Sequence, residues 1–437
     1  PLMFLKPLFP ALLAGALFAS PALADDDVKA DSVVSKKVKK LPKLAIPTGP
    51  PPGQAAYEAM LAEHQGREYE PEAYIAQQVI GLDPKFTHDA RNGLHLIYLR
   101  DYKGARAQFF DLGQNYPGWG IGPVGEVLVW QALMLENFDF RFEVQYQTAL
   151  RKSQAELQAA MELPGNDAWE FFLMAGVLGI DSIHTMRHEE WMKALSRGYE
   201  AMKMVAKVKE LAPDFADIRV GDGLFNYWVT VVSKSTKAIP DMGDKRGDGV
   251  ADMRRVESQG IFLAPAATLA LTFTWIEEGQ KAEALKTAQR NAKRYPNNII
   301  NNLVLARVLM YNNRFADSEK MLKHVQATDP KNRRSHYYLA RLYLRWKKPA
   351  KAIASLDSYL AFSGLDKRDR GVALYYKGVS HQRLQQWDQA EAAYKESWKV
   401  SKLDRSKRRL DSLDKAKARA ESPAPAPAPP PAKPAGG

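Results

Sequence analysis

The chain contains one pair of histidines with the spacing of metal ligands. His184 and His188 lie four residues apart, so a helix would place both rings on one face. Helical zinc motifs also need a glutamate inside the pair, and the intervening residues here are Thr185, Met186 and Arg187. We therefore interpret the pair as ordinary residues near a helix end. The sequence predicts no metal site and no cofactor.

A glycine- and aspartate-rich stretch, residues 221–249, could cradle a phosphate or hold calcium. Gly243 to Gly249 lacks the lysine of a phosphate-binding loop, and no strand precedes it. After Asp241 the alternating ligands of a calcium loop are missing. The stretch is therefore predicted to connect two helices, with Asp248 capping the second. The alternative is that loop residues 234–247 contact a partner protein.

Other catalytic patterns are missing from the sequence. No Gly-x-Ser-x-Gly elbow occurs, and GWGIGP at 118–123 follows no strand. The chain has no cysteine, which excludes thiol catalysis, disulfides and cysteine zinc sites. We therefore predict that the protein is not an enzyme.

The elements that would position any site are helical and repeated. Small residues recur at Ala284, Ser318, Ala352 and Ala390; the first three are evenly spaced, and the last interval is slightly longer. Each follows a helix-length apolar pattern, and none of the segments alternates as a strand would. Small residues allow two helices to cross closely, so the spacing predicts stacked helix pairs.

The repeats resemble the tetratricopeptide repeat. That family has a small residue at position 8, another at 20 and a bulky one at 24, and Gly378, Ala390 and Tyr394 match. An earlier copy has Gly93 and Phe109 at the same spacing. The resemblance implies an all-α helical solenoid whose first helices line a groove. Residues 123–212 are predicted to form degenerate repeats with longer helices.

The ends of the chain differ in composition from the repeats. Residues 1–24 have the charge, apolar run and Ala22-Leu23-Ala24 ending of a secretory signal, with an uncleaved anchor as the alternative. We therefore expect a periplasmic or cell-envelope protein. The predicted divisions are a signal peptide at 1–24, a disordered linker at 25–54, N-terminal repeats at 55–118, a degenerate helical region with a long loop at 119–264, C-terminal repeats at 265–402, a basic capping helix at 403–421 and a disordered Pro/Ala-rich tail at 422–437.

The formal net charge is +12, which favours acidic partners. Groove positions implied by the resemblance are rich in arginine and tyrosine, which bind carboxylates and supply flat contact area. The predicted partner-binding residues are Arg307, Tyr311, Arg334, Tyr337, Arg341, Arg345, Tyr375 and Arg383. We expect acidic segments or C-terminal peptides of envelope proteins, contact of the basic final helix with an anionic envelope surface, and no nucleic acid.

The predicted function is therefore a scaffold or assembly factor of the bacterial cell envelope. A structural part of a trans-envelope machine for motility, pilus assembly or secretion is one alternative. A cell-wall polymer binder or an enzyme is another. A groove that binds no partner would carry the same arginines in a chain this basic, simply as solvated residues. The composition therefore does not decide among these functions.

Overall fold

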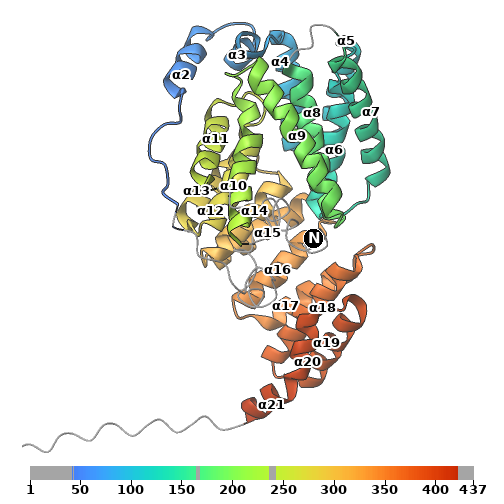
Figure 1. Ribbon diagram of the computed structural model, residues 1–437. Coiled ribbons are helices and arrows are strands. Elements are labelled where there is room, and N and C mark those ends of the chain that lie inside the picture. Colours follow the sequence, from blue (N-terminus) through green and yellow to red (C-terminus); the bar gives the residue numbers. More distant parts are fainter. Residues whose placement is uncertain (1–41, 43, 164–167, 236–242, 422–437) are drawn as a thin grey trace, which may run out of the picture. The chain divides into compact units, whose positions relative to one another are not determined.

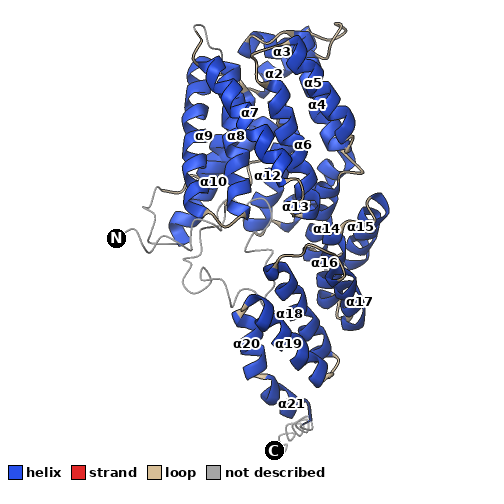
Figure 2. Cartoon of the chain, turned by 90° about the vertical axis from the view of Figure 1, so that its right-hand side faces the viewer, coloured by secondary structure: helices blue, strands red, loops and turns tan. Residues whose placement is uncertain are grey.

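The structure is a computed structural model that describes residues 42, 44–163, 168–235 and 243–421 of the chain (Figure 1). Every regular element in these residues is a helix, and none of them is a strand (Figure 2). The predicted all-α fold is thereby confirmed. The predicted signal segment, most of the predicted linker and the predicted tail at 422–437 lie outside the described residues.

Two compact units divide the chain, Pro1–Ser335 and His336–Gly437. The first unit contains the helices α2 (Gln54–Glu63), α3 (Pro71–Ile80), α4 (Pro84–Leu99), α5 (Tyr102–Asn115), α6 (Ile121–Asn137), α7 (Glu143–Met161), α8 (Ala168–Arg187), α9 (Trp191–Leu211), η3 (Ala216–Ile218), α10 (Arg219–Ser235), α11 (Arg246–Gln259), α12 (Ala264–Glu277), α13 (Lys281–Arg294), α14 (Ile299–Tyr311) and α15 (Phe315–Thr328).

Helix α16 (Arg333–Arg345) begins with the last residues of the first unit and continues in the second. The remaining helices of the second unit are α17 (Pro349–Leu360), α18 (Lys367–Arg383), α19 (Trp387–Ser401), α20 (Asp404–Asp411) and α21 (Leu413–Glu421). The segment predicted as one basic capping helix therefore contains two short helices, α20 and α21.

The turns inside the C-terminal helix pairs follow the predicted repeat. Residues with left-handed backbone occur at Gly279, Asn313, Lys347 and Gln385, with φ of 67°, 58°, 57° and 59°. Each lies the same distance before the small residue of its own repeat, so the turns recur at the intervals of the small residues. The same backbone conformation therefore recurs at the same position of each repeat. This recurrence shows that the pairs α12–α13, α14–α15, α16–α17 and α18–α19 are copies of a single repeat.

Close contact between paired helices depends on the small residues. A Cβ atom at Gly93 would lie 2.7 Å from the ring of Phe109, and one at Gly378 would lie 2.6 Å from the ring of Tyr394. In both pairs the glycine is at position 8 of the repeat, on its first helix, and the aromatic residue is at position 24, on its second helix. Ala390 is fully buried at the same crossing. The bulky ring fills the space that the missing side chain leaves, as the repeat resemblance implies.

The glycines of the stretch 221–249 have a packing role. A Cβ atom at Gly223 would lie 2.9 Å from the carbonyl oxygen of Gly249, and one at Gly249 would lie 2.6 Å from that of Gly223. Helices α10 and α11 therefore cross nearly backbone to backbone. The prediction that Asp248 caps α11 is wrong, because the N-cap is Lys245 and Asp248 lies in the first turn. Residues 236–242 of the connection lie outside the described residues.

The first unit also packs its early helices against its late ones. Asn298 Nδ2 donates a hydrogen bond to the carbonyl oxygen of Tyr98 (3.0 Å), and the rings of Tyr98 and Tyr295 stack with centroids 4.8 Å apart. Asn332 Nδ2 donates to the carbonyl oxygen of Glu136 at the end of α6 (3.0 Å). Helix α14 is enclosed as a result, and all its residues except two are buried.

A buried carboxylate joins η3 to the start of α12. Asp217 accepts hydrogen bonds from the backbone N–H groups of Ile261, Phe262 and Leu263, at 2.7, 2.8 and 2.6 Å. Its side chain has no exposed surface. These donors precede the first turn of α12 and have no partner within the helix, so the carboxylate satisfies them.

The end of the predicted linker lies on α11. The guanidinium of Arg246 is buried, pairs with Glu278 (2.9 Å) and donates to the carbonyl oxygen of Pro42 (2.9 Å). Arg254 donates to the carbonyl oxygen of Gly49 (2.8 Å). Backbone carbonyls without a helix of their own are thus satisfied by arginines of the neighbouring helix.

Candidate functional site

The eight residues predicted to bind a partner are divided between the two units. Arg307, Tyr311 and Arg334 belong to the first unit. The other five belong to the second unit, on the first helices of its two repeats: Tyr337, Arg341, Arg345, Tyr375 and Arg383. Each group is described within its own unit.

The residues of the first unit lie where helices of the same unit pack. Arg307, in the enclosed helix α14, is only 6% exposed. The guanidinium of Arg334 lies 4.9 Å from the centre of the Phe138 ring, and Tyr311 is partly buried at the end of α14. The groove expected from an open solenoid is closed at Arg307, because α14 is buried within its own unit. A partner could reach Arg307 only if that packing opened.

The second unit brings three of its predicted residues to one helix face. Tyr337, Arg341 and Arg345 follow one another by one turn along α16, and all three are partly exposed. The guanidinium of Arg341 lies 5.9 Å from the centre of the Tyr337 ring and 5.5 Å from that of Tyr376 on α18. Adjacent first helices of the repeat therefore share one arginine between two aromatic rings.

The two predicted residues of α18 have different environments. Tyr375 is 2% exposed, so its ring packs inside the unit and offers little surface to a partner. Arg383 is exposed, and its Nη1 donates a hydrogen bond to the carbonyl oxygen of Leu344 at the end of α16 (2.6 Å). Arg383 therefore links two first helices as well as carrying charge at the surface.

Sequence reasoning missed two residues of this region. Arg405 on α20 places its guanidinium 4.4 Å from the centre of the Tyr375 ring and 5.3 Å from that of Tyr376. The sequence favours a solvated cap for the segment that holds Arg405, and Tyr376 lies next to a predicted groove position without occupying one. The adjacent pair Tyr375-Tyr376 was the only feature of the sequence that pointed to Tyr376. Two consecutive tyrosines on a helix face different directions, so both can contact other elements.

We name Tyr337, Arg341, Tyr375, Tyr376 and Arg405 the arginine–tyrosine cluster. The guanidinium groups of Arg341 and Arg405 lie 5.5 and 5.3 Å from the centre of the Tyr376 ring, and the negative face of an aromatic ring attracts such cations. A guanidinium that stacks on a ring uses its flat face for the contact, and its N–H donors lie along its edge. A planar fork of this kind matches a carboxylate, which accepts two parallel hydrogen bonds. The cluster can therefore recognise an anionic group.

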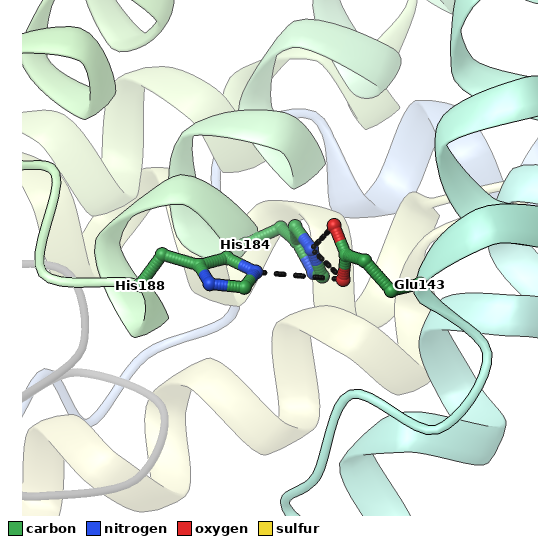
Figure 3. Close-up of side chains that lie close together, drawn as sticks. All are labelled: Glu143, His184 and His188. Carbon is green, nitrogen blue, oxygen red and sulfur yellow. Dashed lines mark hydrogen bonds and ion pairs between the residues drawn. The ribbon is translucent and has the colours of Figure 1, made fainter.

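A second group of polar residues meets in the first unit. Glu143 begins α7, His184 lies in the last turn of α8, and His188 follows the end of that helix (Figure 3). Their potential ligand atoms all lie within 4.8 Å of one another. Burial lowers the pKa of His184 to about 4, against the pull of the Glu143 carboxylate. The sequence predicted no metal site because no glutamate lies between the two histidines, and no local pattern links Glu143 to them.

No helix among the described residues is long and apolar enough to span a bilayer. No protein-family model and no curated protein matches the sequence.

Similar solved structures carry tetratricopeptide repeats. A tetratricopeptide repeat protein from Parabacteroides merdae is 15% identical with a TM-score of 0.38, over 66% of this chain and 98% of that one. The tetratricopeptide-repeat domain of P58(IPK) is 14% identical with a TM-score of 0.25, over 78% of this chain and 100% of that one. At these scores the likeness adds no argument about function. The chain's own helix pairs, with their recurring turns and crossings, show that its fold is a tetratricopeptide-repeat helical solenoid.

Proposed function

We propose that the protein is a non-catalytic scaffold that holds an acidic peptide segment of a partner protein on its second unit. The observation that carries this proposal is the arginine–tyrosine cluster, in which α16, α18 and α20 bring two arginines to a set of tyrosine rings. A scaffold needs recognition without chemistry. The cluster supplies charge and the partly exposed ring of Tyr337, while the buried rings of Tyr375 and Tyr376 support the arginines from within the unit.

Charge complementarity determines the class of partner. The chain has a formal net charge of +12, and the partly exposed Arg345 lies one turn beyond Arg341 on the same helix. Two arginines one turn apart can engage carboxylates on successive residues of an extended peptide, or the two oxygens of a free C-terminus. Arg383 would extend the basic surface along α18.

The cellular setting is part of the proposal. Residues 1–24 have the composition of a secretory signal, so we place the scaffold in the periplasm or cell envelope of a bacterium. Its partners would be envelope proteins. A place in a machine that spans the envelope is compatible with the same surface, and the identity of the captured proteins distinguishes the two.

The test uses the full chain and a defined probe. A fluorescein-labelled peptide of alternating glutamate and serine, with a free C-terminus, is titrated with the protein and followed by fluorescence anisotropy. We expect the double variant Arg341→Glu, Arg345→Glu to weaken binding by at least about tenfold, because like charge replaces a charge-assisted pair. Binding of the unaltered chain should also weaken as salt increases.

The control is a double variant with the same change in net charge at positions outside the arginine–tyrosine cluster. Lys320→Glu with Lys399→Glu alters net charge by the same amount on exposed second-helix positions of α15 and α19. We expect this variant to bind the peptide within about twofold of the original chain. An amidated peptide shows whether the C-terminal carboxylate is required. Equal binding by both double variants would reject the cluster as the binding site.

A further inference from the structure

Three side chains from two helix pairs converge at one edge of the first unit. Nε2 of His184 lies 2.8 Å from Glu143 Oε2, and Nε2 of His188 lies 3.4 Å from the same oxygen (Figure 3). Glu143 and His184 are 41 positions apart in the sequence. Two imidazole nitrogens and one carboxylate, supplied by α7 and by the end of α8, thus face a common point.

Gln131 on α6 determines which nitrogen of His184 is available. Its Oε1 lies 3.2 Å from His184 Nδ1, and an amide oxygen accepts, so this contact favours the tautomer with the proton on Nδ1. In a neutral ring, Nε2 then presents a lone pair toward the Glu143 carboxylate. The partner behind the ring is of the kind that orients metal-bound histidines.

We propose that Glu143, His184 and His188 bind one divalent transition-metal ion, for which Zn²⁺ is the fitting representative. Zinc is held by histidine nitrogens and carboxylate oxygens at about 2.0–2.2 Å, so ligand atoms of a tetrahedral site lie about 3.3 Å apart. The distances of 2.8 and 3.4 Å to Glu143 Oε2 are close to that spacing. Small side-chain adjustments would suffice to admit the ion.

The donor set selects the class of ion. Calcium and magnesium prefer all-oxygen sites, whereas two imidazoles with one carboxylate suit zinc and its first-row neighbours. Glu143 is supported by its own neighbour, since Gln147 Nε2 donates to Glu143 Oε1 (2.9 Å). Both outer residues, Gln131 and Gln147, hold ligands in place without neutralising them.

The surroundings leave one side of the group accessible. His184 is 1% exposed, but the side chains of His188 and Glu143 are 34% and 30% exposed. The ring of Phe140 stacks on His188 with centroids 3.9 Å apart and so fixes its orientation. Three protein ligands leave a fourth position, which would face solvent and take water or a side chain of a partner.

One nearby charge opposes a cation. The guanidinium of Arg187 lies 4.5 Å from the centre of the Phe140 ring and donates to the carbonyl oxygen of Asp139 (2.6 Å). These contacts hold it beside the three ligands without joining them. The bound ion would link the start of α7 to the end of α8 and so connect two neighbouring helix pairs.

The experiment uses the untagged full chain, stripped with a chelator and dialysed. Isothermal titration with ZnCl₂ should show one site per chain, and CoCl₂ should give the visible absorption of a tetrahedral complex. We expect Glu143→Gln and His188→Ala to weaken Zn²⁺ binding by more than the roughly 10–100-fold that loss of an outer partner causes. His188 is partly exposed, so its variant should keep the fold, which circular dichroism verifies.

A matched pair elsewhere on the first unit serves as control. His88 Nδ1 lies 2.6 Å from Glu70 Oε2, but no second histidine joins them among the described residues. His88→Gln should therefore bind Zn²⁺ as the original chain does. The proposal would be overturned by the absence of zinc uptake in the stripped chain, by unchanged affinity in Glu143→Gln and His188→Ala, or by an equal loss in His88→Gln. None of these variants alters the arginine–tyrosine cluster.

Discussion

Replacement of Asp217 by alanine should destabilise the first unit more than any surface substitution. The carboxylate is fully buried and accepts three backbone N–H groups, those of residues 261–263. Alanine removes both oxygens and leaves all three donors without a protein partner. The loss would be felt at the start of α12, where the degenerate helices meet the C-terminal repeats.

The magnitude follows from the three hydrogen bonds. Each buried donor left unsatisfied costs about 1–3 kcal/mol, so the sum is about 3–9 kcal/mol before relaxation. Backbone adjustment and water entry reduce this, and we expect about 3–5 kcal/mol. Asp217→Asn should cost less, because Oδ1 alone accepts from both Phe262 and Leu263, while the new amide opposes the N–H of Ile261.

The assay is urea unfolding followed by circular dichroism, with hydrogen exchange of the amides at 261–263 measured in parallel. The control is Asp111→Ala, which removes an exposed carboxylate from α5. We expect a lower urea midpoint and faster local exchange in Asp217→Ala than in Asp217→Asn, and no change in the control. An Asp217→Ala midpoint equal to that of the control would refute the reasoning.

Three further substitutions have defined outcomes. Gly378→Ala should destabilise the second unit by about 1–3 kcal/mol in urea unfolding, because its Cβ would meet the Tyr394 ring, whereas Gly176→Ala, which meets no atom within 4 Å, should not destabilise its own unit. Glu136→Gln should lower the free energy of unfolding by about 3 kcal/mol in chemical unfolding, because Arg100 and Tyr102 then lose the charge of a carboxylate that is only 2% exposed. Burial lowers the pKa of His184 to about 4, so its stabilising contribution is complete above pH 6.5 and falls by up to about 3 kcal/mol as the pH drops toward 4. Midpoints measured across that pH range in chelator should vary less in His184→Gln.

Much of the fold was predictable because the repeat is a local property. The small residues from Ala284 to Ala390 require a helix crossing in each repeat, whatever lies elsewhere in the chain. The left-handed turns at Asn313 and Lys347 recur at the same interval. Gly93 and Gly378 could be paired with Phe109 and Tyr394 from sequence alone, since each pair lies within one helical hairpin.

The groove was less predictable, because burial depends on contacts between distant segments. Arg307 has the sequence position of a groove residue, yet it belongs to a helix enclosed when early and late helices of the first unit pack together. Arg405 has the sequence of a solvated cap, yet it stacks on Tyr375. No local pattern specifies either outcome.

The histidine pair shows the same division most clearly. The sequence alone determined the four-residue spacing of His184 and His188, which places His184 in the last turn of α8 and His188 just beyond its end. Only the tertiary structure brought Glu143 to them, across 41 positions of sequence and from a different helix. Spacing along one helix is fixed by backbone geometry, whereas the meeting of two helices depends on the packing of the whole unit.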